Sequence, residues 1–218
     1  MRDAGGSRTA DGPHLLDDVL SVSRETRERL EVYVGLVEKW QKSQNLVAPS
    51  TLPQIWRRHV ADSAQVHATR PDLKRWVDLG SGAGFPGLVT AILLTGVAGA
   101  AVHLVESNRG KAAFLRTVAR ETGAPAIVHD ERIDSFVKDF AESVDGVSAR
   151  ALASFTQLCG WAAPFVARGA VAVFHKGQDF GVELAEATLS WDLDLVEHGS
   201  KTEPTGRLVE VRKIVSRE

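Results

Sequence analysis

Apolar residues recur at helical spacing in the first part of the chain. Leu30, Val34, Val37 and Trp40 follow one another at steps of three or four residues, with charged residues between them. This spacing predicts an amphipathic helix from about residue 15 to residue 45. After a break at residues 48–50, which contain a proline, a second helix is predicted over residues 53–68.

From residue 71 onward the pattern changes to short apolar runs, rich in Val, that alternate with helical stretches. The predicted strands are 75–79, 101–106, 126–129, 144–149, 170–175, 193–197 and 208–215, and the predicted helices between them are 86–95, 111–121, 154–167 and 182–190. Near-continuous apolar strands separated by helices are typical of a parallel sheet covered on both faces. The last connection, residues 199–206, is too short for a crossover helix, so the final strand is predicted to run antiparallel.

These patterns divide the chain into three predicted parts. Residues 1–13 contain almost nothing to bury, which predicts a disordered tail. Residues 14–70 form a small helical extension, and residues 71–218 form the α/β domain.

Composition excludes several kinds of site and several classes of protein. The 218 residues include 26 Lys and Arg against 28 Asp and Glu, so a nucleic-acid partner must be held by a local basic patch. The single cysteine, Cys159, excludes an internal disulfide and a cysteine-rich zinc cluster and fits a reducing compartment. The seven histidines show no pair at metal-ligand spacing, so no metal is predicted. The sequence shows neither a secretory signal nor a membrane span, so we expect a cytoplasmic protein that binds no membrane.

A glycine-rich turn follows the first predicted strand. The sequence reads Asp78-Leu79-Gly80-Ser81-Gly82-Ala83-Gly84-Phe85-Pro86-Gly87. Glycines without side chains let backbone lie close to a ligand, and the carboxyl end of this strand is where open α/β sheets bind ligands.

Two cofactors compete for this turn. The fingerprint Gly82-x-Gly84-x-x-Gly87 by itself fits a dinucleotide. The carboxylate of Asp78 would repel a pyrophosphate but attract the α-ammonium group of S-adenosylmethionine (AdoMet), which therefore fits better than NAD. Glu106, at the end of the next strand, is placed to accept hydrogen bonds from ribose hydroxyls of either cofactor.

The segment after the third predicted strand, residues 130–134, leaves two interpretations open. An acid or a backbone amide there could pair with the adenine edge while Ile133 packs on its face. The alternative is a helix N-cap with solvated charges.

The residues at the end of the fourth strand and the single cysteine limit which kinds of atom could accept a methyl group. The fourth strand ends in Ala149-Arg150-Ala151-Leu152, without the Asn/Asp-Pro-Pro-aromatic sequence of exocyclic-amine methyltransferases. Cys159 lies within a predicted helix between apolar and small residues, which indicates a buried thiol and not a nucleophile. What remains is an atom that is already nucleophilic, such as guanine N7, which carries no proton and needs no general base.

Several motifs together resemble those of one family. They are Lys39-Trp40 with Asn45-Leu46, Arg58-His59-Val60-Ala61-Asp62-Ser63, the glycine turn, Glu106-Ser107 with Lys111 and Phe114-Leu115, Arg150-Ala151, and Lys176-Gly177. Across residues 32–214 the chain resembles the RsmG (GidB) family of bacterial 16S ribosomal RNA guanine-N7 methyltransferases. The chain departs from the family pattern at Val47, at Asp134, where the acid is shorter, and at His175.

The resemblance implies a class I methyltransferase fold, a Rossmann-like α/β fold whose mostly parallel seven-stranded sheet has an antiparallel last strand, with a small helical N-terminal extension. It implies methyl transfer from AdoMet to N7 of a guanosine in the 16S rRNA loop near the decoding site. The partner would be 16S rRNA or the small ribosomal subunit, and we expect a monomer. By motif position the family's cofactor contacts fall on Gly80, Phe85, Ile133, Asp134 and Arg150, and the turn argument adds Asp78, Gly82, Gly84 and Glu106.

No residue is assigned as catalytic, but five are candidates for positioning RNA or the target base: Arg58, His59, Asp62, Arg150 and Lys176. Arg58 and Asp62 are also spaced for a simple ion pair within one helix. Two other functions stay open at this point. One is a nicotinamide-dependent oxidoreductase, and the other is a non-catalytic RNA-binding factor for ribosome assembly.

Overall fold

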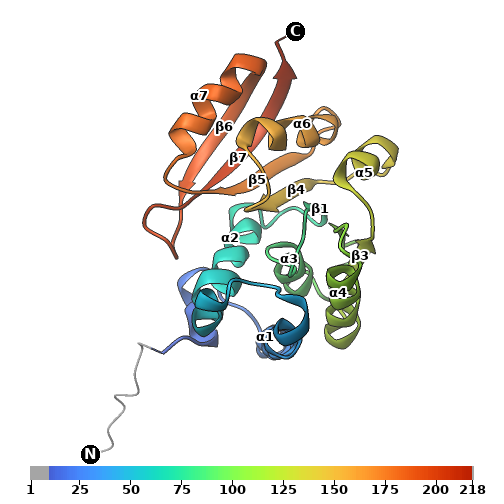
Figure 1. Cartoon of the computed structure of the whole chain (residues 1–218), viewed down its shortest axis with the longest axis vertical. Coiled ribbons are helices and arrows are strands. Elements are labelled where there is room, and N and C mark those ends of the chain that lie inside the picture. Colours follow the sequence, from blue (N-terminus) through green and yellow to red (C-terminus); the bar gives the residue numbers. More distant parts are fainter. Residues whose placement is uncertain (1–9, 218) are drawn as a thin grey trace, which may run out of the picture.

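The first part of the chain is helical, but it is more divided than the sequence predicts. The computed structural model describes residues 10–217 (Figure 1). A 3₁₀ helix, η1 (Pro13–Asp18), precedes the long helix α1 (Arg24–Gln44) where one continuous helix was predicted. The hydroxyl of Ser23 accepts the N–H of Thr26 and so starts α1, and Asn45, in the left-handed conformation, ends it.

The second predicted helix consists of three elements in series. They are a 3₁₀ helix, η2 (Pro49–Gln54), a π-helical turn, η3 (Trp56–Ala61), and an α-helix, α2 (Asp62–Thr69). Residues 1–9 of the predicted tail lie outside the described residues. At the end of that predicted tail, the carboxylate of Asp11 accepts the backbone N–H groups of Trp56 and Arg57 and holds the start of η3.

A single seven-stranded sheet forms the centre of the molecule, in the order β3-β2-β1-β4-β5-β7-β6. Its strands are β1 (Arg75–Leu79), β2 (Ala101–Val105), β3 (Ala126–His129), β4 (Gly146–Arg150), β5 (Val171–Lys176), β6 (Trp191–Gly199) and β7 (Arg207–Ser216). The first five strands pair in parallel, whereas β7 pairs antiparallel with both β5 and β6. The predicted class of fold, with its antiparallel last strand, is confirmed.

Helices cover both faces of this sheet. They are α3 (Gly87–Leu93), α4 (Arg109–Thr122), α5 (Ile133–Asp139), α6 (Phe155–Val166) and α7 (Phe180–Ser190). In Figure 1 the N-terminal helices lie beside α3 and α4, and α5, α6 and α7 lie on the other side of the sheet. Neighbouring residues of β1 point to opposite faces, so Trp76 joins the apolar cluster under α3 while Val77 joins the one under α6. The helix α5 was not predicted.

The helical extension packs on the α/β domain through a shared core. Leu30 and Tyr33 of α1 belong to the same buried cluster as Trp76 and Leu104 of the sheet. The hydroxyl of Tyr33 also donates a hydrogen bond of 2.6 Å to the carbonyl of Ala83 in the glycine turn. Residues on both sides of the predicted boundary at residue 70 therefore share one hydrophobic core. No helix of the described part is long and apolar enough to span a membrane.

Candidate active site

The glycine turn joins β1 to α3 in a conformation that favours glycine. Gly80 and Gly82 have φ values of 66° and 56°, in the left-handed region. A Cβ atom on Gly80 would lie 2.4 Å from a methyl carbon of Leu152, so any side chain there would displace Leu152 as well as adopt a strained φ. The turn therefore presents bare backbone to the space above the carboxyl end of β1.

A cavity of about 420 Å³ lies above this turn, and we call it the loop cavity. Its lining includes seven of the nine residues predicted to bind the cofactor, which are Gly80, Gly82, Phe85, Glu106, Ile133, Asp134 and Arg150. The cavity lies at the carboxyl ends of β1, β2 and β4, where open α/β sheets bind ligands.

Glu106 ties the glycine turn to the segment after β2. One carboxylate oxygen accepts the backbone N–H of Gly82 at 2.9 Å, and the other accepts the N–H of Asn108 at 2.7 Å. Each carboxylate oxygen can accept a further hydrogen bond. Glu106 is thus held in a defined orientation and can still accept hydrogen bonds from a diol.

At the other side of the loop cavity, the side chain of Asp134 is 65% exposed and accepts a hydrogen bond of 2.8 Å from the indole of Trp161. Trp161 also lines the cavity, and no motif in the sequence points to it. Ile133 lies next to Asp134 in the lining, so this segment presents both an apolar and a polar side chain to the cavity.

The side chain of Asp78 lies away from the loop cavity, unlike the prediction. Its carboxyl is 1% exposed and is absent from the lining of the loop cavity, because it lies beneath the turn. One oxygen accepts the hydroxyl of Ser148 at 2.7 Å, and the other has no hydrogen-bond partner among the described residues. Burial raises the pKa of Asp78 to about 6, the opposite of what an ion-paired carboxylate would show. A direct pair between Asp78 and a cation in the cavity does not fit this geometry.

Gly84 is the second predicted cofactor residue that does not line the loop cavity. Its φ is 96°, and an added Cβ atom would meet the side chains of Leu88 and Tyr33. Gly84 therefore allows α1 and α3 to pack closely against the turn.

A second cavity of about 590 Å³, here called the adjoining cavity, shares a wall with the first. Arg150, Ala151 and Leu152, which follow from the end of β4, line both cavities. The adjoining cavity brings together all five residues predicted to position RNA or the target base, which are Arg58, His59, Asp62, Arg150 and Lys176.

Arg150 is the centre of the network in this shared wall. Its Nη1 donates to the carbonyl of Arg58 and to Asp62, both at 3.0 Å, and its Nη2 donates to Nδ1 of His59 at 2.9 Å. The guanidinium also lies 5.3 Å from the ring centre of Phe85. These contacts join the N-terminal helices to the end of β4.

Asp62 is the acidic partner in this network. Burial would raise the pKa of Asp62, but His175, Arg150 and a hydrogen bond of 2.7 Å from the hydroxyl of Thr202 outweigh it, so the pKa is lowered. The alternative of an ion pair between Arg58 and Asp62 is wrong, because Arg58 pairs instead with Glu203 at 3.4 Å. Thr202 and Glu203 come from the β6–β7 loop.

His59 has no free nitrogen with which to act as a base. Arg150 can only donate, so Nδ1 accepts and Nε2 carries the proton, which it donates to the hydroxyl of Thr51 at 2.8 Å. Burial and, next, the charge of Arg150 lower the pKa of His59 to about 4. The ring stacks on Phe85 with 5.0 Å between ring centres, so His59 is held between Phe85, Arg150 and Thr51.

Two further side chains meet at the end of β5. Nζ of Lys176 lies 2.5 Å from a carboxylate oxygen of Glu183 in the first turn of α7. Both residues line the adjoining cavity, and Glu183 was not among the predicted site residues. Cys159 is buried, and burial raises the pKa of its thiol to about 12, as expected for a structural residue.

Comparison with known proteins identifies the family. Residues 26–207 match the family described as rRNA small subunit methyltransferase G. The ribosomal RNA small subunit methyltransferase G of Bradyrhizobium sp. strain BTAi1 is 52% identical over 190 residues, covering 87% of this chain and 86% of the relative. The protein of the same name from Rhizobium meliloti is 48% identical over 201 residues, covering 91% and 94%.

Solved structures with low sequence identity share the fold. The crystal structure of cofactor-bound Rv0187 from MTB has a TM-score of 0.60 at 14% identity, over 91% of this chain and 94% of that one. The O-methyltransferase TomG from Streptomyces achromogenes, in complex with SAM, has a TM-score of 0.59 at 12% identity, over 89% and 92%. The fold is thus that of class I methyltransferases, and the extent of the match to its relatives shows that this chain belongs to the rRNA small subunit methyltransferase G family.

Proposed function

We propose that this chain transfers the methyl group of AdoMet to N7 of a guanosine in the decoding-region loop of 16S rRNA. Family membership supports methyl transfer to small-subunit rRNA and removes the oxidoreductase alternative. The observation that carries the proposal is the pair of cavities that share the wall Arg150–Leu152. A cofactor in the loop cavity and a base in the adjoining cavity would meet across that wall.

The residues of the loop cavity fit AdoMet, which supplies a methyl group activated by its positive sulfur. Glu106 can accept both ribose hydroxyls, since both of its oxygens are oriented by backbone N–H groups. Ile133 offers an apolar surface for the adenine, with Asp134 beside it. The backbone of Gly80 and Gly82 leaves room for the methionine part. The buried carboxyl of Asp78 lies outside this cavity.

The chemistry at N7 requires positioning and no proton transfer. The N7 lone pair carries no proton, so a reaction at this atom does not need a base. This agrees with His59, both of whose nitrogens are occupied. When the N–CH₃ bond forms and the S–CH₃ bond breaks, the positive charge moves from sulfur to the purine ring.

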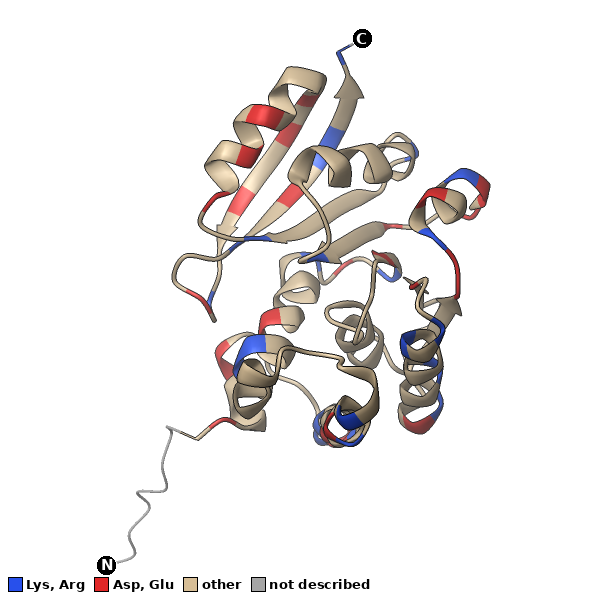
Figure 2. Cartoon of the chain, in the orientation of Figure 1, with Lys and Arg blue, Asp and Glu red and all other residues tan. Residues whose placement is uncertain are grey.

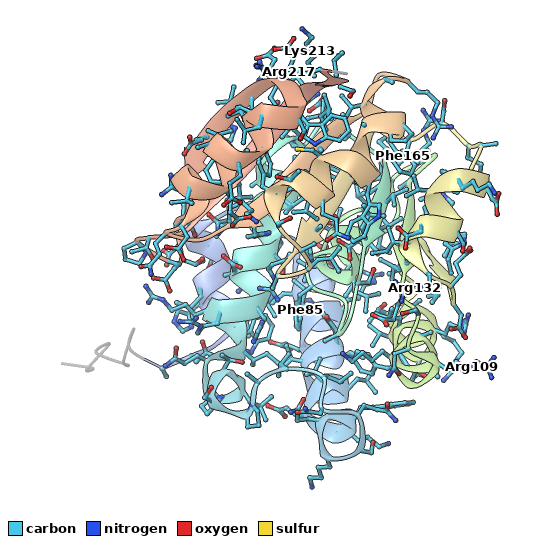
Figure 3. The ribbon with its side chains drawn as sticks, turned by 45° about the horizontal axis from the view of Figure 1, so that its top comes forward. Phe85, Arg109, Arg132, Phe165, Lys213 and Arg217 are labelled. Atoms are coloured by element: carbon cyan, nitrogen blue, oxygen red, sulfur yellow. The ribbon has the colours of Figure 1, made fainter. Side chains whose placement is uncertain are left out.

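Contact with RNA phosphates would come from local basic surface. Arg58 is 49% exposed at the rim of the adjoining cavity. Figure 2 shows Lys and Arg along α4, and Asp and Glu along α7 and β6. Arg109 of α4 and Arg132 before α5 lie on the same side of the molecule (Figure 3). With a net charge of −2 for the whole chain, local basic surface of this kind favours docking of RNA phosphates there.

The partner we propose is 16S rRNA or the small ribosomal subunit. The chain would act as a monomer in the cytoplasm, where that subunit is found.

Unmodified 30S particles, tritiated AdoMet and mass-spectrometric mapping of nucleosides test the function. We expect label in one 7-methylguanosine of the decoding-region loop. Label at another atom or in another region would refute the assignment of N7 or of its site. No label at all, with AdoMet bound, would favour a non-catalytic assembly factor.

A further inference from the structure

The ion pair of Lys176 and Glu183 is more than a structural link, because both side chains keep unused hydrogen-bonding capacity toward the adjoining cavity. Of the three N–H bonds of Lys176, one is directed at Glu183 and one at the carbonyl of Ala153, at 3.4 Å. The side chain of Lys176 is 8% exposed, so the remaining N–H has access to little besides this cavity.

Only one of the two carboxylate oxygens of Glu183 accepts hydrogen bonds from the described residues. Its Oε2 accepts both Lys176 and the backbone N–H of Phe155, at 2.7 Å. No described residue donates a hydrogen bond to Oε1. The side chain is 26% exposed and lines the adjoining cavity. An ammonium donor and a free carboxylate acceptor therefore lie side by side in the cavity wall.

This arrangement complements one nucleobase edge. The Watson–Crick edge of guanine presents the acceptor O6 beside the donors N1–H and N2–H₂, and enzymes that act on an extruded base read that edge. Lys176 can donate to O6 while Glu183 accepts from N1–H and N2–H₂. Adenine presents a donor where Lys176 needs an acceptor, and an acceptor where Glu183 needs a donor.

The position of the pair also suits a reaction at N7. Lys176 ends β5, which neighbours β4 on the side away from β1, so the pair lies one strand farther from the glycine turn than Arg150. Adjacent strands are separated by about 4.8 Å. In guanine, N7 lies on the opposite side of the ring system from N2. A guanine with its Watson–Crick edge on Glu183 can therefore turn N7 toward the wall shared with the loop cavity.

We propose that Lys176 and Glu183 select guanine at the target position by reading its Watson–Crick edge. This proposal rests on the proposed function and adds the residues that determine base specificity. Both are specificity residues and neither takes part in bond formation.

Inosine tests the contact, because it lacks only the N2 amine and keeps N1–H, O6 and N7. Small subunits would be reconstituted from 16S rRNA with guanosine or inosine at the target position, and kcat/KM for transfer from tritiated AdoMet would be measured. For the unaltered enzyme we expect guanosine to be preferred by about 10- to 100-fold, the usual effect of losing a hydrogen bond to a charged group.

In the variant Glu183→Gln we expect slower reaction on guanosine and a guanosine-to-inosine ratio of less than about threefold, because the neutral amide no longer provides a charged acceptor for N2. AdoMet affinity should not change, since Glu183 does not line the loop cavity. The matched control is Glu186→Gln, three residues further along α7, where the side chain is exposed and outside both cavities. This control should keep the ratio of the unaltered enzyme.

A ratio in Glu183→Gln equal to that of the unaltered enzyme would overturn the proposal. Equal rates on guanosine and inosine for the unaltered enzyme would also overturn it, even if the variant fails to fold. If the unaltered enzyme does not methylate the target guanosine at all, the proposed function itself fails. The two failures are therefore distinguishable.

Discussion

The buried carboxyl of Asp78 permits a quantitative test of how the floor of the loop cavity is built. We consider Asp78→Asn, which keeps the shape of the side chain and an oxygen that can accept the hydroxyl of Ser148. Burial raises the pKa of Asp78 from 3.8 to about 6. Because each pKa unit corresponds to about 1.4 kcal/mol, the carboxylate costs the folded state about 3 kcal/mol above pH 6.

The sign of the pH dependence follows from the raised pKa. As pH increases from about 4 to about 6, the unfolded chain loses the Asp78 proton before the folded chain does, so this residue lowers stability across that window. Asn cannot ionise. The difference in free energy of unfolding between Asp78→Asn and the unaltered protein should therefore shift in favour of the variant by up to about 3 kcal/mol between pH 4 and pH 7.5.

Urea denaturation followed by tryptophan fluorescence at several pH values measures that difference. Ser148→Ala provides the second arm, because loss of its hydrogen bond removes stabilisation of the ionised form and should enlarge the pH dependence. AdoMet affinity of Asp78→Asn, by calorimetry, should stay within a fewfold of the unaltered protein. A pH-independent difference in stability, or a collapse of AdoMet affinity without loss of stability, would refute the buried position and place the carboxylate in the cavity.

Three further outcomes are expected from single substitutions. Glu106→Ala should weaken AdoMet binding by roughly 10- to 100-fold, because two charge-assisted hydrogen bonds that order the turn are lost; an unchanged Kd by calorimetry would contradict this role. Cys159→Ala should leave kcat within about twofold of the unaltered enzyme, since a buried thiol with a raised pKa is no nucleophile. Loss of label transfer in a folded variant would instead indicate a covalent mechanism through this thiol. Arg58→Ala should leave the Kd of AdoMet unchanged but raise KM for small subunits and reduce its salt dependence; this assignment to the rim fails if cofactor affinity falls instead.

The sheet could be predicted closely because its strands are local features of the sequence. The predicted strand 75–79 has the observed bounds of β1, and the predicted strand 126–129 has those of β3. Both are short runs between turn residues. The helix α5 was missed although Ile133, Phe136, Val137 and Phe140 stand at helical spacing, because the element is only seven residues long and three of those residues are charged.

The error at Asp78 concerns direction and not position. Side chains alternate along a strand, so Asp78 lies on the same face of β1 as the buried Trp76. That alternation indicates a side chain directed under α3 and away from the cavity above the strand end. The motif identified the correct residue, and the alternation of side chains along the strand predicts the orientation that the structure shows.

The network around Arg150 could not be predicted in full because its partners are distant in sequence. Thr202 reaches Asp62 across 140 residues, and Arg150 reaches His59 across 91. Individual residues of the network stand in recognisable motifs, but no local pattern shows that the β6–β7 loop meets the N-terminal helices. Trp161 and Glu183 were missed for the same reason.

The hydrogen bonds of the site depend on the number of residues in the π-helical turn Trp56–Ala61. Such a turn contains one residue more than an α-helical turn. Deletion of one residue there would restore the ordinary α-helical pitch, because the extra residue is what widens the turn. The carbonyl of Arg58 would then accept an N–H group within the helix and would no longer accept from the guanidinium of Arg150. A one-residue insertion or deletion between positions 56 and 61 should thus be less well tolerated than most substitutions of the side chains within it.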